Sequence, residues 1–101
     1  MKTEAYEEYL LKDLQDLDYA VGYLSAALEE GADVFFLAIR NIAKAQGGMK
    51  ALSDATKLNR ESLYDMLSKQ GNPLFSSITS VLSNLGIEIA FRKKDDGRDV
   101  A

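Results

Sequence analysis

The run of apolar residues at positions 34–39 is the feature that most constrains how this chain can fold. A helix that carries six such residues in a row is too apolar to face water on every side, so we expect it at the centre of the fold. Asp33 is the expected N-cap of this helix, and Gly47-Gly48 breaks its pattern. The sequence therefore predicts a central helix over about Val34–Gln46.

Apolar residues spaced three and four apart predict further helices on both sides of the central one. Asp18 and Asn59 are expected to cap two of them, because a short polar side chain accepts hydrogen bonds from free N–H groups. Gly31 and the Gly-Asn-Pro triplet at 71–73 are expected to end helices. The expected ranges are about Glu4–Gln15, Tyr19–Glu30, Met49–Thr56, Arg60–Lys69 and Phe75–Leu85. The stripes expected on their inner sides include Val21 and Leu28, Leu52 and Ala55, Leu63 and Met66, and Phe75 and Ile78.

The apolar period changes from 3.6 to 2 after Gly86, because Ile87, Ile89 and Phe91 alternate with less apolar residues. This alternation predicts a half-buried strand. A lone strand leaves its backbone groups unpaired, so we expect a partner strand from a second copy or from another protein. The predicted fold is all-α, with about five to six helices and one short C-terminal β-strand. We expect a helical segment at 1–32, a domain at 33–92 and a disordered tail at 93–101.

Histidine and cysteine are both absent from the sequence. Their absence removes disulfides, thiolate metal sites, thiol nucleophiles and the commonest general acid or base. The acids are scattered along helix faces, so we expect neither an enzyme nor a metal or other cofactor. No apolar stretch approaches the roughly 20 residues that cross a bilayer, and the acidic N-terminus does not resemble a signal peptide. We therefore expect a cytoplasmic protein that does not contact the membrane.

The net charge of −4 is unevenly distributed along the chain. Residues 1–33 contain two lysines and nine acids, a local charge of −7, whereas residues 34–72 carry +3 and residues 73–101 are neutral. An acidic segment beside a mildly basic centre fits a DNA-binding protein that also binds a basic protein. Ordinary solvated helix surfaces are the alternative interpretation of the same charges.

Two short helices, Met49–Thr56 and Arg60–Lys69, are expected to be joined by a tight turn and packed on the central helix. This is the helix-turn-helix arrangement, in which the second helix enters the major groove. Leu52 and Ala55 would be buried, Leu58 would fill the space between the helices, and Leu63 with Met66 would hold the second helix.

The outward positions of the second helix carry residue types that suit base reading. Arg60 can donate two hydrogen bonds to guanine, Asn59 can read adenine, and Glu61 can accept from cytosine. Tyr64 offers a flat apolar ring with a hydroxyl. The residues expected to contact phosphates are Lys50, Ser62 and Lys69.

Each of these residues also has a purely structural interpretation. Asn59 is a helix cap first, and Arg60 and Glu61 are by default solvated or paired within the chain. Asp65 has the wrong charge for phosphates and is expected to hold Arg60 or Lys69.

The stretch Met49–Leu67, followed by the Gly-Asn-Pro triplet at 71–73, resembles the addiction-module antidote proteins. These are HigA-like antitoxins within the lambda-repressor-like helix-turn-helix group. The Asn-Arg-Glu-Ser-Leu-Tyr block at 59–64 is the most specific part of the resemblance, which covers about residues 10–92. Lys57 stands where the family usually has glycine, and Ser53 stands where alanine is usual.

The resemblance implies a double role. Such an antidote neutralises a small basic toxin, typically a ribonuclease, and represses its own operon by binding operator DNA as a homodimer. Two alternatives stay open: a stand-alone regulator with no toxin, and a toxin-binding module that uses the helix-turn-helix only as a scaffold.

Overall fold

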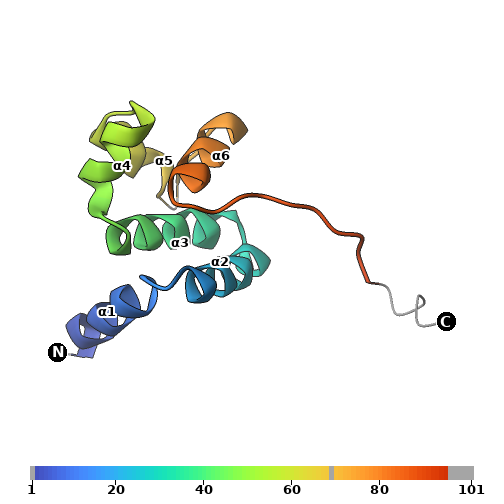
Figure 1. The fold of residues 1–101 in the computed structure, drawn as a ribbon, viewed down its shortest axis with the longest axis horizontal. Coiled ribbons are helices and arrows are strands. Elements are labelled where there is room, and N and C mark those ends of the chain that lie inside the picture. Colours follow the sequence, from blue (N-terminus) through green and yellow to red (C-terminus); the bar gives the residue numbers. More distant parts are fainter. Residues whose placement is uncertain (1, 69, 96–101) are drawn as a thin grey trace.

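Six α-helices make up the regular secondary structure of the residues that the structure describes (Figure 1). This structure is a computed structural model, and it describes the backbone of residues 2–68 and 70–95 and the side chains from residue 5 onward. The prediction of an all-α fold with five to six helices is confirmed. The helices are α1 (Lys2–Asp13), α2 (Leu17–Glu30), α3 (Ala32–Ala45), α4 (Gly48–Thr56), α5 (Arg60–Met66) and α6 (Phe75–Asn84).

Helix α3 lies at the centre, as its apolar sequence predicts. Figure 1 shows α1 and α2 on one side of it and α4, α5 and α6 on the other. It packs against α1, α2 and α4. Its buried side chains, each at most 2% exposed, are Ala38, Ile39, Ile42 and Ala43.

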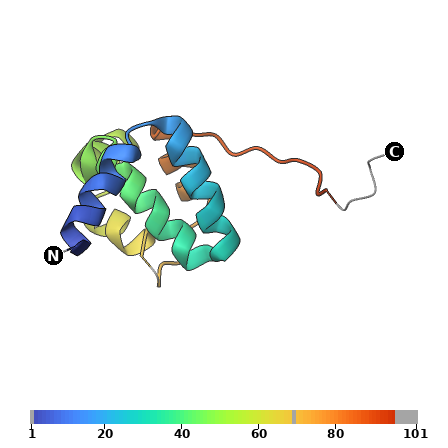
Figure 2. The ribbon, with the colours of Figure 1, turned by 90° about the horizontal axis from the view of Figure 1, so that it is seen from below.

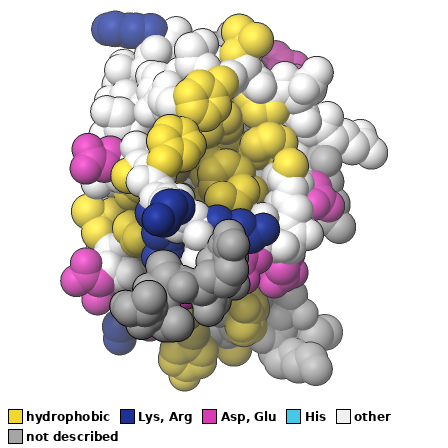
Figure 3. Space-filling model, turned by 90° about the vertical axis from the view of Figure 1, so that its right-hand side faces the viewer, with side chains coloured by type: hydrophobic (Ala, Val, Ile, Leu, Met, Phe, Trp, Pro, Cys, Tyr) yellow, Lys and Arg dark blue, Asp and Glu magenta, His cyan; other side chains and the backbone are white. Residues whose placement is uncertain are grey.

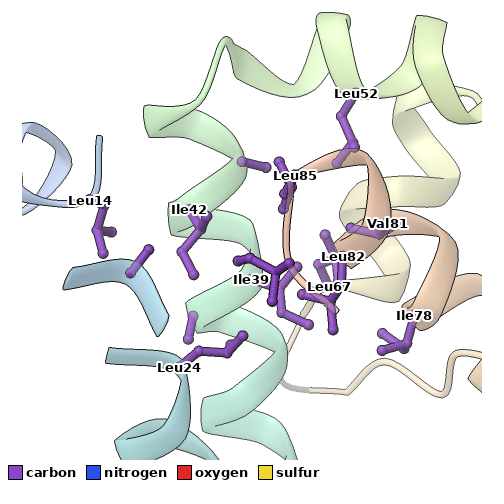
Figure 4. Close-up of a cluster of buried hydrophobic side chains, with 14 of the residues drawn as sticks. Leu14, Leu24, Ile39, Ile42, Leu52, Leu67, Ile78, Val81, Leu82 and Leu85 are labelled. Atoms are coloured by element: carbon purple, nitrogen blue, oxygen red, sulfur yellow. The ribbon is translucent and has the colours of Figure 1, made fainter. Parts of the chain in front are cut away.

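One continuous hydrophobic core connects the two sides of α3 (Figure 4). Leu14 and Leu24 contribute to it from below α3, and Leu52 and Leu82 contribute from the other side. No polar or charged residue is buried among the described residues. The fold is therefore held by apolar burial, while the polar side chains lie on the surface where they can meet partners.

Two of the predicted helix caps are wrong by a few residues. The N-cap of α2 is Asp16, whose carboxylate accepts from the Asp18 N–H at 2.9 Å, so the predicted cap Asp18 lies in the first turn. The N-cap of α3 is Gly31, and the predicted cap Asp33 accepts only from the neighbouring Val34 N–H. Gly31 has φ 137°, so one glycine both ends α2 and begins α3.

Four residues of the predicted inner stripes lie at the surface instead. Ala55 is exposed, because Met49 and Leu52 are the buried residues of α4. Val21, Leu28 and Phe75 are 46%, 58% and 67% exposed. These three line one groove beside the C-terminal segment, so their stripes continue onto a surface that nothing in the single chain covers.

The predicted strand is not formed in the single chain. Residues 87–91 are extended but belong to no strand, and the rest of the described chain is helix, turn or loop. The physical reason is the one noted in the sequence: a strand needs a partner, and this chain supplies none within 2–68 and 70–95. Residues 96–101 of the predicted tail lie outside the described residues.

Neither a membrane-spanning helix nor a metal-binding cluster is found in the described residues. No helix there combines the length and the apolar character needed to cross a bilayer. No three residues of the types that bind metals come together either.

Candidate nucleic-acid interface

A three-residue turn at 57–59 joins α4 to α5, and its backbone is tied by hydrogen bonds. The Lys57 N–H donates to the Ser53 carbonyl at 2.9 Å, which closes α4. The Ser53 hydroxyl donates to the Leu58 carbonyl at 2.6 Å. Ser53, which replaces the alanine usual in the resembling family, thus fixes the start of the turn. Leu58 is half-buried between the helices, as predicted.

Lys57 has the left-handed backbone conformation, with φ 68° and ψ 12°, and it is the one non-glycine residue of the described chain with a positive φ. This conformation places a side chain too close to the following carbonyl, which is why glycine is usual at such a position. The unusual residue that the sequence shows here is therefore a source of local strain.

Helix α5 buries one side and presents the other to solvent. Leu63 and Leu67, at the end of α5, are both 0% exposed and anchor it to the core. Met66 is half-buried. The side chains that face solvent are Asn59, Arg60, Glu61, Ser62, Tyr64 and Asp65. Every predicted base-reading residue thus lies on the exposed side.

Asn59 acts as the N-cap of α5, as predicted. Its Oδ1 accepts from the Ser62 N–H at 2.7 Å. Reading adenine with both amide atoms needs a free Oδ1, so only the Nδ2 donor remains for an outside contact. The role of Asn59 in this site is mainly to set where α5 begins.

Arg60 and Glu61 are exposed at the start of α5 and have no ion-pair partner among the described residues. Asp65 was expected to hold Arg60 or Lys69. The structure gives no ion pair between Arg60 and Asp65, and Lys69 lies outside the described residues. Arg60 is thus free to donate its fork of N–H groups to a ligand.

Arg40 is a residue of this site that the sequence did not reveal. Its guanidinium lies over the Tyr64 ring, 4.8 Å from the centroid, and its Nη2 donates to the Tyr64 carbonyl at 3.3 Å. A cation at a C-terminal carbonyl also suits the helix dipole. Arg40 therefore joins α3 to α5 and fixes the Tyr64 ring, a contact that spans 24 residues and has no local signal.

The predicted phosphate-binding residue Lys50 is paired within the chain. Its Nζ lies 3.2 Å from Asp54 Oδ2, with both side chains at least 70% exposed. Exposed pairs of this kind contribute little to stability, and they dissociate readily. Together with Glu61 and Asp65, this pair keeps the positive charge of the surface low.

Gly71 holds the loop that follows α5. A Cβ at this position would collide with the carbonyls of Met66 and Asp65, so only glycine allows the chain to pass this close to the helix end. The same close return explains why α5 ends at Met66 rather than at the predicted Lys69.

Residues 5–93 match a protein family described as a probable addiction module antidote protein. The match covers most of the chain, including all of α2–α6. The chain belongs to this family. No curated protein and no solved structure matches it.

Membership of the antidote family identifies the general role of the protein. An antidote of an addiction module is a regulatory protein rather than a catalyst, and its partner is a toxin. The family match also spans both the α4–α5 pair and the extended segment after Gly86, so the family description includes both surfaces.

Proposed function

We propose that this antidote is the antitoxin of a type II module, and that it neutralises a small toxin and represses its own operon. The exposed side of α5, with Arg60 unpaired and Leu63 anchoring the opposite side, carries the DNA-binding part of the proposal. In a lambda-repressor-like, HigA-like helix-turn-helix, this side of the second helix enters the major groove. Residues 33–92 would form the DNA-binding unit and residues 1–32 the partner-binding segment.

The exposed side chains of α5 suggest a division of contacts. Arg60 would donate to a guanine edge, Glu61 would accept from cytosine, and the Tyr64 hydroxyl and the Asn59 Nδ2 would add polar contacts. Lys50, Ser62 and Lys69 would meet phosphates. A two-fold homodimer would place its two α5 helices at half-sites about 34 Å apart, or a multiple of that.

A mobility-shift titration with the DNA upstream of the gene tests this assignment. Arg60→Ala should weaken operator binding by about 1–3 kcal/mol and relax the preference at one base pair. Lys12→Ala, which removes an equal charge from the exposed surface of α1, should leave it unchanged. Lys69→Ala should weaken binding to all sequences alike and lower the salt slope by about one. Equal effects of the Arg60 and Lys12 variants would show that the assigned surface is wrong.

The low positive charge of the α4–α5 surface favours one rival, in which the helix pair is only a scaffold for binding the toxin. Lys50 is neutralised by Asp54, and Glu61 and Asp65 add negative charge beside Arg60. The rival predicts weak DNA binding that is the same for operator and unrelated sequence, so the same titration distinguishes the two.

The surface of α1 and α2 offers the features that a small basic toxin would recognise. Tyr6 and Tyr9 on α1 are 67% and 71% exposed, and Tyr19 on α2 is 47% exposed. Exposed tyrosines are typical anchors in protein interfaces, and the surrounding acids would attract a basic partner. Glu7 is already 3.7 Å from Lys44 Nζ, which ties α1 to α3.

Co-purification with the product of the neighbouring gene tests toxin binding. Tyr9→Ser should release the toxin, because it removes an exposed aromatic anchor without changing the core. Phe91→Ser, which removes an equally exposed ring from the far end of the chain, is the matched control. A stand-alone regulator would retain no neighbouring protein at all.

A further inference from the structure

The chain leaves the helices after Ile87 and continues as an extended segment. Ile87 is 8% exposed and its N–H donates to the Leu82 carbonyl at 2.9 Å, so this residue is anchored on its own domain. Residues 88–92, called here the arm, make no backbone hydrogen bond to another described residue. Figures 1 and 2 show from two directions that the arm points away from the helices.

The arm borders an apolar groove. The groove has a volume of about 480 Å³ and is lined by α2, the first turn of α3, α6 and the arm itself. Figure 3 looks onto this face and shows hydrophobic side chains gathered around a hollow, with basic side chains beside it. Leu28, Phe75 and Phe91 are 58%, 67% and 90% exposed here. Apolar side chains this exposed, and gathered on one face, are typical of a surface that binds another protein.

We propose that the arm pairs antiparallel with the arm of a second copy, and that the two paired arms cover the grooves of both copies. The proposal rests on the dimer of the proposed function and names the surface that forms it. The alternation of the arm supports it, because Ile89 and Phe91 share one side while Glu88, Ala90 and Arg92 share the other. Backbone pairing would satisfy the N–H and C=O groups that the single chain leaves without partners.

The sequence of the arm selects one register. A shift by a single residue would place apolar side chains opposite polar ones, so symmetric registers differ by two residues. With Ala90 opposite Ala90 of the second copy, Glu88 faces Arg92 and Ile89 faces Phe91, each pair occurring twice. Centred on Ile89, the pairing would use Ile87, which is already buried in its own domain. Centred on Phe91, it would place Ile89 opposite Lys93.

This charge complementarity makes a second copy, rather than an unrelated protein, the occupant that the arm fits. Neither Glu88 nor Arg92 has an ion-pair partner within residues 2–68 and 70–95. In the Ala90-centred register each finds the opposite charge directly across the ribbon, where such pairs stabilise a sheet. The apolar side of the ribbon then faces the groove that Ile89 and Phe91 already line.

Sedimentation equilibrium of the full chain tests the arm. Phe91→Ser should weaken self-association about tenfold or more, because it removes the largest apolar side chain of the interface. Tyr9→Ser, which removes a ring that is 71% exposed on α1, should leave self-association unchanged. Both side chains are exposed, so both variants should retain the wild-type helical content by circular dichroism.

Charge reversal tests the register. Glu88→Arg and Arg92→Glu should each weaken self-association several-fold at low salt, because each places like charges opposite one another. An equal mixture of the two variants should associate as mixed dimers with near-wild-type affinity, and native mass spectrometry can count these dimers. The double variant should also recover.

Several results would overturn the arm. These are a wild-type chain that is monomeric at high micromolar concentration, a Phe91→Ser dimer as tight as the wild type, or random pairing of the charge variants. Loss of the neighbouring toxin without loss of self-association would assign the arm to the toxin instead. Operator binding through Arg60 is measured separately, so its failure would refute the proposed DNA role and leave the arm standing.

Discussion

The α4–α5 surface and the arm with its groove are both exposed, but their side chains are held in different ways. On α5, Asn59 caps the helix and Arg40 fixes the Tyr64 ring. On the other surface, Phe75 and Phe91 are 67% and 90% exposed and gain nothing from the water around them. Polar groups can thus be oriented within one chain before a ligand arrives, whereas exposed apolar groups are stabilised only when a second molecule covers them.

Gly71→Ala should break the α5 side of this comparison most strongly. The new Cβ would collide with the Met66 and Asp65 carbonyls, so we expect a loss of about 2–3 kcal/mol in the free energy of unfolding. DNA binding should fall with it. Urea denaturation followed by circular dichroism measures the change.

Gly22→Ala is the matched control for that substitution. Nothing lies within 4 Å of a Cβ at Gly22, which is an exposed position inside α2. Alanine there should raise stability by about 0.5–1 kcal/mol, because it favours the helix. Equal losses in the two variants would contradict the role assigned to Gly71.

Arg40→Ala should loosen α5 without touching its outer side. Loss of the stacking on Tyr64 and of the hydrogen bond to its carbonyl should cost about 1–2 kcal/mol of stability and lower operator affinity. Arg40→Lys keeps the charge but not the planar guanidinium, so it should recover only part of both. Unchanged stability and affinity in Arg40→Ala would show that Tyr64 needs no support.

Lys57→Gly should raise stability by about 1 kcal/mol, because glycine adopts the left-handed conformation of this turn without the Cβ clash. Lys57→Ala retains the Cβ and should change little. Thermal and urea unfolding of the two variants give the comparison. A less stable glycine variant would show that the turn carries no strain.

Asp54→Asn should have the smallest effect on folding and sharpen the electrostatic side of the comparison. The exposed pair with Lys50 is worth less than about 1 kcal/mol, so stability should hardly change. Freed from Asp54, Lys50 should strengthen DNA binding and steepen the salt dependence by up to about one. Asp13→Asn removes the same charge from α1 and should do neither.

Features with a local cause could be predicted from the sequence. The central position of α3 follows from its apolar run, and the cap at Asn59 follows from residue type. The unusual turn at Lys57 is visible because a residue other than glycine stands there. The exposed positions of α5 follow from the spacing of Leu63 and Leu67.

Features with a distant cause could not be predicted. Arg40 meets Tyr64 across 24 residues, and the α5 end is set by how closely the chain returns at Gly71. Ala55 and Phe75 fit helical stripes, but whether a stripe is buried depends on a neighbour that periodicity does not reveal. The extended segment after Gly86 was predicted as a strand, and its pairing depends on a second chain.

The central position of α3 has a consequence for genetic screens. This helix contacts α1, α2 and α4, and through Arg40 it also contacts α5. A substitution at Ile39 or Ile42 therefore removes support from every exposed surface at once, and a strain that carries it loses toxin control and repression together. Mutants that separate the two phenotypes should map to surface positions such as Arg60 or Tyr9, and they identify the binding surfaces directly.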